Sequence, residues 1–151
     1  MIAPDPRESG LTLVEMLVVL AIVGVMAGTV VLSAGAGSGR GAEVEARRLA
    51  ARLELAADET MVTGRPVAFV GGRSGYRFLV RQAGRWRDET APALEPYTLP
   101  SGLTLEGAGA APVVIGADGG GSPLDLRLVP ARGTGWAIAF DGVAASAKAG
   151  G

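Results

Sequence analysis

The feature that most constrains this chain is an apolar run from Leu11 to Leu32. At a rise of about 1.5 Å per residue, a helix of this length can cross a hydrocarbon core of about 30 Å. One charge interrupts the run, that of Glu15 near its N-terminal end. A carboxylate within hydrocarbon costs roughly 2.5 kcal/mol or more and is usually kept for a function. The run therefore predicts a membrane anchor whose single charge has a purpose.

Two ordinary interpretations leave part of this segment unexplained. A signal peptide could be cleaved at residues 34–36, Ala-Gly-Ala, but its usual basic region is missing, because Asp5 and Glu8 accompany Arg7. A plain single-span anchor accounts for the length of the run and leaves Glu15 without a role. Both alternatives stay open on composition alone.

A third interpretation comes from the residues at the start of the run. The segment from Gly10 to Glu15, GLTLVE, followed by an unbroken apolar helix, closely resembles the type IV prepilin signature of pilins and type II secretion pseudopilins. The resemblance implies that a prepilin peptidase cuts after Gly10 and that the new N-terminal residue, Leu11, is methylated. It also implies that Glu15 is the acid at the fifth mature position. The family more often has Phe or Met where this chain has Leu11, and its leaders are usually more basic than MIAPDPRESG.

Under this interpretation Glu15 has a physical task in assembly. Cleavage leaves a charged amine on Leu11 at the edge of an apolar helix, where an isolated ammonium is as costly as an isolated carboxylate. Pairing the amine of one subunit with Glu15 of a neighbour satisfies both charges. A misplaced subunit leaves both unpaired, so the pair selects register even if it adds little net stability.

Two glycines add a weaker signal to the same segment. Gly24 and Gly28 form a G-x-x-x-G pair, which lets a second helix approach closely in lipid or in a filament core. Simple tolerance of glycine in a membrane helix explains the pair equally well.

A change of composition after Leu32 marks the end of the anchor. Residues 33–41 are rich in glycine, which disfavours helix by about 1 kcal/mol per residue relative to alanine, so we expect a hinge there. Residues 42–63 then predict an amphipathic helix, with apolar or small residues at three- and four-residue spacings. These are Ala46, Leu49, Leu53, Ala56 and Thr60, and Gly64 and Pro66 follow as a stop signal.

Beyond this helix the pattern changes to short alternating segments. Residues 66–70 and 76–81 predict a hairpin, and further strands are expected near Trp86 and at residues 103–105, 113–115, 124–128 and 136–140. One helix followed by antiparallel strands predicts an α+β head, with the helix packed on the sheet.

Composition excludes most catalytic sites. The chain has no cysteine, no histidine and only one lysine, Lys148. Thiolate nucleophiles, Cys/His zinc sites and histidine-based triads are therefore absent, and we expect no enzyme, no metal site and no cofactor. The glycine-rich stretch at residues 116–123 lacks the Gly-Lys ending of a phosphate loop and the carboxylate spacing of an EF-hand, so a turn is expected there. A formal net charge of −1 gives no field that would attract nucleic acid.

Two groups of side chains each allow a binding role or a purely structural one. The arginines of the amphipathic helix, Arg47, Arg48 and Arg52, alternate with acidic residues, which favours a solvated face over a nucleic-acid patch. The aromatic residues could line a ligand groove, although a role in the core is favoured because the domain has few other large side chains. They are Tyr76, Phe78, Trp86, Trp136 and Phe140.

A second resemblance extends over most of the chain. The order of the arginine-rich helix, a Gly-Arg-Pro-Val turn at residues 64–67, the LPSGL segment at 99–103 and Trp136 is similar to the minor pseudopilin H family of type II secretion and its relative FimT. The resemblance implies a low-abundance subunit at the tip of a periplasmic pseudopilus that supports protein export. A FimT-like minor pilin of a type IV pilus is the alternative, and a membrane-tethered periplasmic enzyme or binding module is a third.

Together these features predict a chain in four parts. They are a prepilin leader (1–10), a transmembrane and assembly helix (11–32), a hinge (33–41) and a periplasmic head (42–151) whose β-rich part spans 65–143. The resemblance implies a single-pass protein of the bacterial inner membrane, in contact with lipid through residues 11–32. Its implied partners are the prepilin peptidase, the other minor pseudopilins, the major pseudopilin and the inner-membrane assembly platform.

Overall fold

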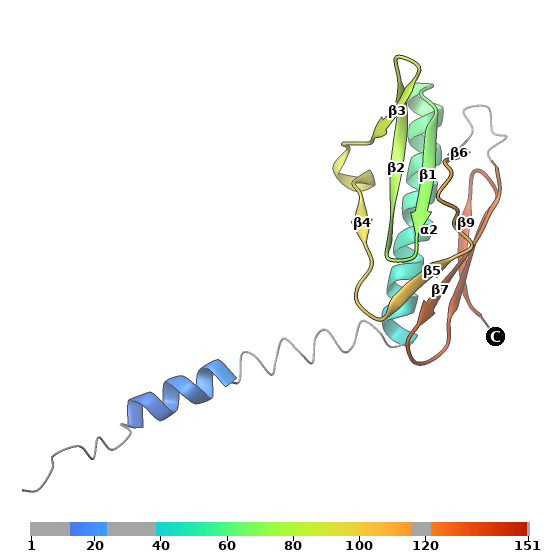
Figure 1. Ribbon diagram of the computed structural model, residues 1–151. Helices are drawn as coiled ribbons and strands as arrows, with labels where there is room; N and C mark the ends of the chain where they lie inside the picture. The colour runs from blue at the N-terminus through green and yellow to red at the C-terminus, as the bar shows by residue number, and fades with distance from the viewer. Residues whose placement is uncertain (1–12, 24–38, 116–121, 151) are drawn as a thin grey trace, which may run out of the picture. The chain divides into compact units, whose positions relative to one another are not determined.

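The computed structural model describes residues 13–23, 39–115 and 122–150. By its internal contacts the chain divides into two compact units, residues 1–32 and residues 33–151. The first unit contributes one described helix, and the described part of the second contains one α-helix, a short 3-10 helix and nine strands (Figure 1).

The described part of the first unit, residues 13–23, is helical throughout, and all its side chains are exposed. Among the described residues, none forms a helix long and apolar enough to cross a membrane. The expected span at 11–32 extends beyond this segment at both ends, onto residues that the structure does not describe.

Helix α2 (Gly39–Thr63) is the amphipathic helix that the spacing of small and apolar residues predicts. All five of the expected inward positions are fully buried: Ala46, Leu49, Leu53, Ala56 and Thr60. The helix ends at Thr63 and is followed by Gly64, whose φ of 65° lies in the left-handed region and whose N–H donates to the carbonyl of Thr60 at 2.9 Å. Both the periodicity and the stop signal are therefore confirmed.

The start of α2 differs from the expectation. The helix begins at Gly39, three residues before the predicted start at Ala42, so the last residues assigned to the hinge are helical. A side chain at Gly39 would lie 3.7 Å from the backbone of Thr134, and one at Gly133 would lie 3.2 Å from the nitrogen of Gly39. Close packing of the first turn against this loop compensates for the low helix propensity of glycine.

The first sheet is antiparallel and has the strand order β3-β2-β1-β6, with β4 also paired to β2. The predicted hairpin is present, and Val67 lies opposite Val80 in it. The strands of this sheet are β1 (Val67–Gly72), β2 (Gly75–Gln82), β3 (Arg85–Asp88), β4 (Tyr97–Thr98) and β6 (Val113–Ile115). A short 3-10 helix, η1 (Pro92–Leu94), lies between β3 and β4.

The second sheet is also antiparallel, in the order β5-β7-β8-β9. Its strands are β5 (Leu103–Glu106), β7 (Leu124–Pro130), β8 (Trp136–Phe140) and β9 (Ala145–Ala149). Strand β7 shows the expected alternation, with Leu124, Leu126 and Leu128 buried and Asp125 and Arg127 exposed. The α+β prediction is thus confirmed, while β4 and β9 had not been expected.

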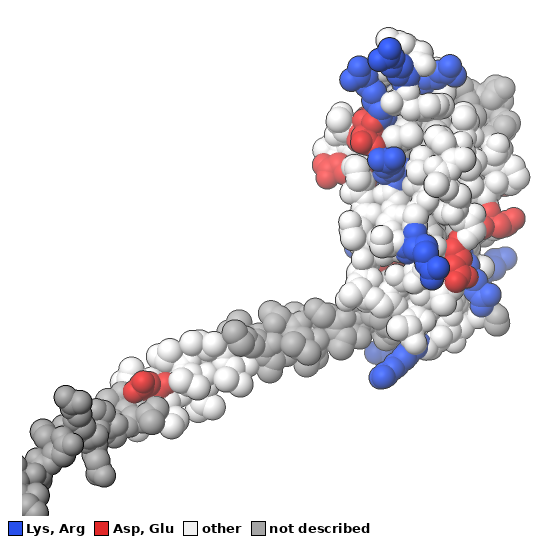
Figure 2. Space-filling view, in the orientation of Figure 1, with Lys and Arg blue, Asp and Glu red and all other residues white. Residues whose placement is uncertain are grey.

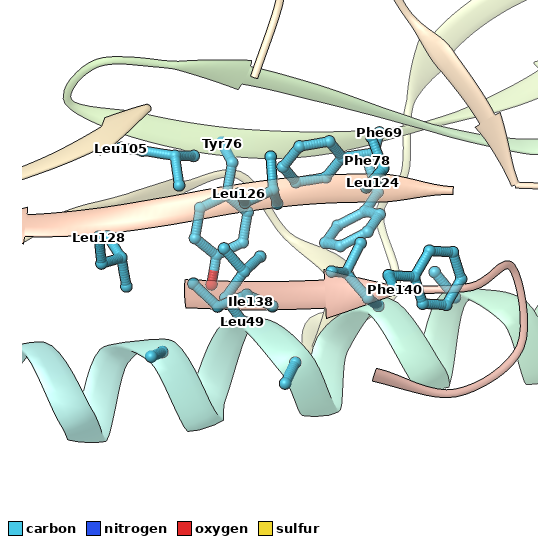
Figure 3. Close-up of a cluster of buried hydrophobic side chains, with 14 of the residues drawn as sticks. Leu49, Phe69, Tyr76, Phe78, Leu105, Leu124, Leu126, Leu128, Ile138 and Phe140 are labelled. Atoms are coloured by element: carbon cyan, nitrogen blue, oxygen red, sulfur yellow. The ribbon is translucent and has the colours of Figure 1, made fainter. Parts of the chain in front are cut away.

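The core lies where α2 meets the inner faces of both sheets (Figures 1 and 3). Leu49 of α2, Ile138 of β8 and Phe69 of β1 are each at most 1% exposed. The ring centroids of Phe69 and Phe78 lie 5.6 Å apart in an edge-to-face arrangement. A single continuous core therefore holds the helix and the two sheets together.

Candidate functional site

Residues 13–23 form the part of the assembly segment that the structure describes. Nine large apolar side chains in it are between 48% and 77% exposed: Leu13, Val14, Met16, Leu17, Val18, Val19, Leu20, Ile22 and Val23. Glu15 is the only charged residue among them. A helix that is apolar on every side needs an apolar environment, either lipid or other helices.

The other residues that the prepilin pattern singles out lie outside the described residues. They are Gly10 and Leu11 at the expected cleavage site, and Gly24 and Gly28 at the expected helix contact. Their roles stay predictions. The glycine-rich stretch expected to form a turn at 116–123 is described only at Ser122 and Pro123.

A polar cluster on α2 was missed by the sequence analysis. Glu45 is only 6% exposed, and its carboxylate accepts a hydrogen bond from Arg48 at 2.9 Å. Arg48 also donates to the hydroxyl of Tyr97, and its guanidinium lies 5.1 Å from the centre of that ring. The three residues fasten β4 to the helix.

Arg52 makes a second connection between α2 and the same segment. Its Nε donates to the carbonyl of Ala93 at 2.8 Å, and its guanidinium also donates to the carbonyl of Glu95. The guanidinium lies 5.2 Å from the ring centre of Tyr76 and 5.5 Å from that of Phe78. Arg52 therefore covers the edge of the aromatic core while holding η1 in place.

The environment of these tyrosines keeps them neutral. Burial raises the pKa of the Tyr76 hydroxyl above its usual value, and the nearby Arg52 guanidinium only partly opposes this shift. Desolvation also raises the pKa of Tyr97, and Glu45 adds to the effect. Both phenols are therefore protonated at neutral pH, in keeping with a structural cluster.

The helix arginines divide into two groups, and the aromatic residues differ in how they relate to the core. Arg47 is solvated as expected, since it is 69% exposed and pairs with Glu43 at 2.9 Å, whereas Arg48 and Arg52 make structural contacts.

Among the aromatic residues, Tyr76, Phe78 and Phe140 are core residues, as favoured. Trp136 packs partly against the core. Trp86 is half-buried on β3 and lies outside the main core.

Among the described residues, no three acidic side chains lie close enough together to hold a metal ion. The interior where the helix meets the sheets is filled with apolar side chains (Figure 3).

Two family models match the chain. The model of the prokaryotic N-terminal methylation motif matches residues 5–31, and the model of the type II transport protein GspH matches residues 45–144. The second match covers more than half of the chain. The chain belongs to the GspH family. The first match contains Glu15 and the whole described part of the apolar helix.

Two relatives agree with this assignment. The type II secretion system protein H of Escherichia coli (strain K12) is 30% identical over 151 residues, covering 85% of this chain and 85% of the relative. The protein of the same name from Aeromonas hydrophila is 33% identical over 109 residues. That match covers 67% of this chain but only 60% of the Aeromonas protein.

Solved structures agree on the fold. A structure of the minor pseudopilin EpsH from the type 2 secretion system of Vibrio cholerae has a TM-score of 0.60, covering 72% of this chain and 94% of that one. A second EpsH structure gives a TM-score of 0.57, with 72% and 92% covered. At 19% identity in both cases, the similarity establishes the pilin-like fold and nothing more.

Membership of the family indicates what type of protein this chain is. The chain is a type II secretion minor pseudopilin of the H type with a prepilin methylation motif, and its family is structural and not enzymatic. The motif implies processing by a prepilin peptidase and anchoring in the inner membrane. The secretion interpretation is thereby favoured over the FimT-like alternative, and membership of a non-enzymatic family contradicts the enzyme half of the third alternative.

Proposed function

We propose that the chain is cleaved after Gly10, methylated on Leu11 and inserted into a pseudopilus through its apolar helix. The observation that carries this proposal is the helix of residues 13–23, which exposes nine large apolar side chains and one acid. The methylation motif matched at residues 5–31 supports the same placement of the cleavage site.

Glu15 is the assembly residue in this proposal. Its carboxylate is costly in an apolar environment, and the free amine of a neighbouring subunit's Leu11 offsets that cost. The carboxylate of Glu15 and the amine of Leu11 pair with each other when two subunits meet in the correct register. Close helix contact at Gly24 and Gly28 would let the subunits approach to the required distance.

The head then presents surfaces to other subunits in the periplasm. Its buried core and two antiparallel sheets make it a self-contained domain, so contacts with partners must use its surface. Its proposed position is the tip of the pseudopilus, with the other minor pseudopilins and the major pseudopilin as neighbours. The inner-membrane assembly platform inserts it, and the filament supports export across the outer membrane.

The test compares three chains in cells that carry the matching secretion system: the parent, Glu15→Leu and the charge-preserving control Glu15→Asp. Mass spectrometry of the mature N-terminus should show methylated Leu11 in all three. Membrane abundance should be unchanged or higher in Glu15→Leu, because the variant removes a charge from an apolar helix. Its crosslinking to other pseudopilins should fall at least tenfold, and Glu15→Asp should retain part of it.

Three outcomes contradict parts of this proposal. A parent N-terminus at Gly35 or Gly37 would mean that an ordinary signal peptidase had acted. Full crosslinking and export by Glu15→Leu would exclude the pairing role of the acid. Loss of cleavage in Glu15→Leu would move its role to recognition by the peptidase.

A further inference from the structure

We propose that an arginine-rich tip of the head docks onto a carboxylate-rich surface of another pilin-like subunit. The arginine tip consists of Arg65, Arg81, Arg85 and Arg87 together with Trp86. This inference rests on the proposed assembly into a pseudopilus and adds to it a second contact, on the head.

The β2-β3 hairpin and the end of α2 bring the arginine tip together. Arg81 lies opposite Trp86 in the hairpin, and Gln82 lies opposite Arg85. The N–H of Arg81 donates to the carbonyl of Pro66 at 3.0 Å, which places Arg65 beside the same end of β2. Figure 2 shows basic side chains gathered at this end of the head.

The hairpin presents these side chains on both of its faces. Because side chains alternate along a strand, Arg81 and Trp86 share one face and Arg85 and Arg87 share the other. The turn between them is tight, since Ala83 and Gly84 both have positive φ angles, 48° and 78°. Positive φ at both central residues is typical of a type I′ turn, which fixes the geometry of the hairpin. A fixed surface loses less entropy when it binds.

Positive charge at the arginine tip is only partly compensated. Arg65 pairs with Glu59 at 3.2 Å, and Arg81 lies over the ring of Trp86 at 5.8 Å. Within the described residues, Arg85 and Arg87 have no acidic group within 4.0 Å. The whole chain carries a formal net charge of −1, so the arginine tip is a local excess of positive charge.

The composition of the arginine tip fits a protein partner. Arginine and tryptophan are enriched among the residues that dominate binding energy at protein interfaces. Trp86 is half-buried, and its ring is already held beside Arg81. Arginine forks bind carboxylates with two parallel hydrogen bonds, so a partner with clustered Asp and Glu side chains is the complementary surface.

The distribution of basic residues at the arginine tip argues against a nucleic acid as its partner. A nucleic acid would need a basic stripe or groove, and the basic residues here are confined to one hairpin and one turn.

The experiment uses the full chain in cells with its own secretion system. A photo-crosslinking residue, p-benzoylphenylalanine, replaces the exposed Gln82. The test variant is Arg85→Glu/Arg87→Glu, and the matched control is Arg73→Glu/Arg132→Glu. The control makes the same change of charge at two exposed arginines at the opposite end of the head, where Arg73 lies in the β1-β2 turn and Arg132 in the β7-β8 turn.

We expect the parent to crosslink to another pseudopilin within a segment rich in Asp and Glu. The test variant should reduce this product at least tenfold, the control should stay within twofold of the parent, and Arg85→Gln/Arg87→Gln should fall between them. Reversing the charge of the contacted acids on the partner should restore crosslinking of the test variant.

Four results would overturn the inference: crosslinks of the parent to phospholipid or nucleic acid, no crosslink at all, an unchanged yield in the test variant, or an equal loss in the control. A second crosslinker, at Leu17 in the apolar helix, reports assembly in the same cells. Loss of that signal from the parent contradicts the proposed function. If the Leu17 crosslink forms in the parent and any of the four results is also observed, only the role of the arginine tip is contradicted.

Discussion

The two α-helices that the structure describes use apolar residues in opposite ways. Residues 13–23 expose apolar side chains on every face, whereas α2 buries one face that includes Leu49, Leu53 and Thr60. The second pattern lets a helix complete a core from its own chain, and the first requires an environment that the chain does not supply. The head thus completes its core with its own side chains, whereas the described N-terminal helix leaves its apolar side chains exposed.

The largest expected effect is a difference in how much the two helices contribute to the free energy of unfolding of the head. Leu49→Ala should lower the free energy of unfolding of the head by about 2–5 kcal/mol, because it leaves a cavity among fully buried side chains. Leu17→Ala makes the same chemical change on the exposed helix and should leave that free energy within about 0.5 kcal/mol of the parent. Urea unfolding of the full chain in mild detergent measures both.

Tryptophan fluorescence makes this comparison specific to the head. The only two tryptophans, Trp86 and Trp136, both lie in the second unit. An equal loss of stability in Leu17→Ala would mean that the apolar helix contributes to the fold of the head. The division between a folding helix and an assembly helix would then be wrong.

A smaller effect should appear on the polar side of α2. Arg52→Ala removes two hydrogen bonds to backbone carbonyls and the cover over the rings of Tyr76 and Phe78, so we expect a loss of about 1–3 kcal/mol. Arg47→Ala removes only an exposed pair and should cost less than about 0.5 kcal/mol. Equal losses in the same unfolding assay would show that the contacts of Arg52 do not stabilise the fold.

Local patterns in the sequence predict part of this structure well. Alternation along β7 and the spacing of small and apolar residues along α2 depend only on near neighbours, and both were predicted. The register of Gly10, Leu11 and Glu15 is local as well, and it indicated a pilin-like protein.

Features that depend on distant contacts were missed. The cluster of Glu45 and Arg48 is completed by Tyr97, 49 positions beyond Arg48. Strand β9 has the sequence ASAKA, which has little β propensity, and its pairing with β8 defines it. A hydrogen bond at 2.9 Å from the N–H of Ala145 to Glu54 of α2 further fixes this strand. Such long-range contacts cannot be predicted from the spacing of residues that are close in the sequence.

The smallest expected effect tests whether hydrogen bonds within the head stabilise one of its surface turns. Oδ1 of Asp141 accepts hydrogen bonds from the backbone N–H groups of Ala144, at 2.8 Å, and Val143, at 2.9 Å. These bonds lower the pKa of the Asp141 carboxyl below its usual value, the one to Ala144 most strongly. A lowered pKa in the folded state means that the stabilisation is present above the unfolded value, about 3.9, and is lost as pH falls through the folded value. The urea midpoint of Asp141→Ala should therefore lie below that of the parent at pH 6, and this difference in midpoint should shrink at pH 2.

The matched control is Asp141→Asn, which keeps an acceptor oxygen but cannot titrate. The difference in urea midpoint between Asp141→Asn and Asp141→Ala should change little between the two pH values. A gap between the parent and Asp141→Ala that is equal at both pH values would show that the ionised carboxylate does not hold this turn.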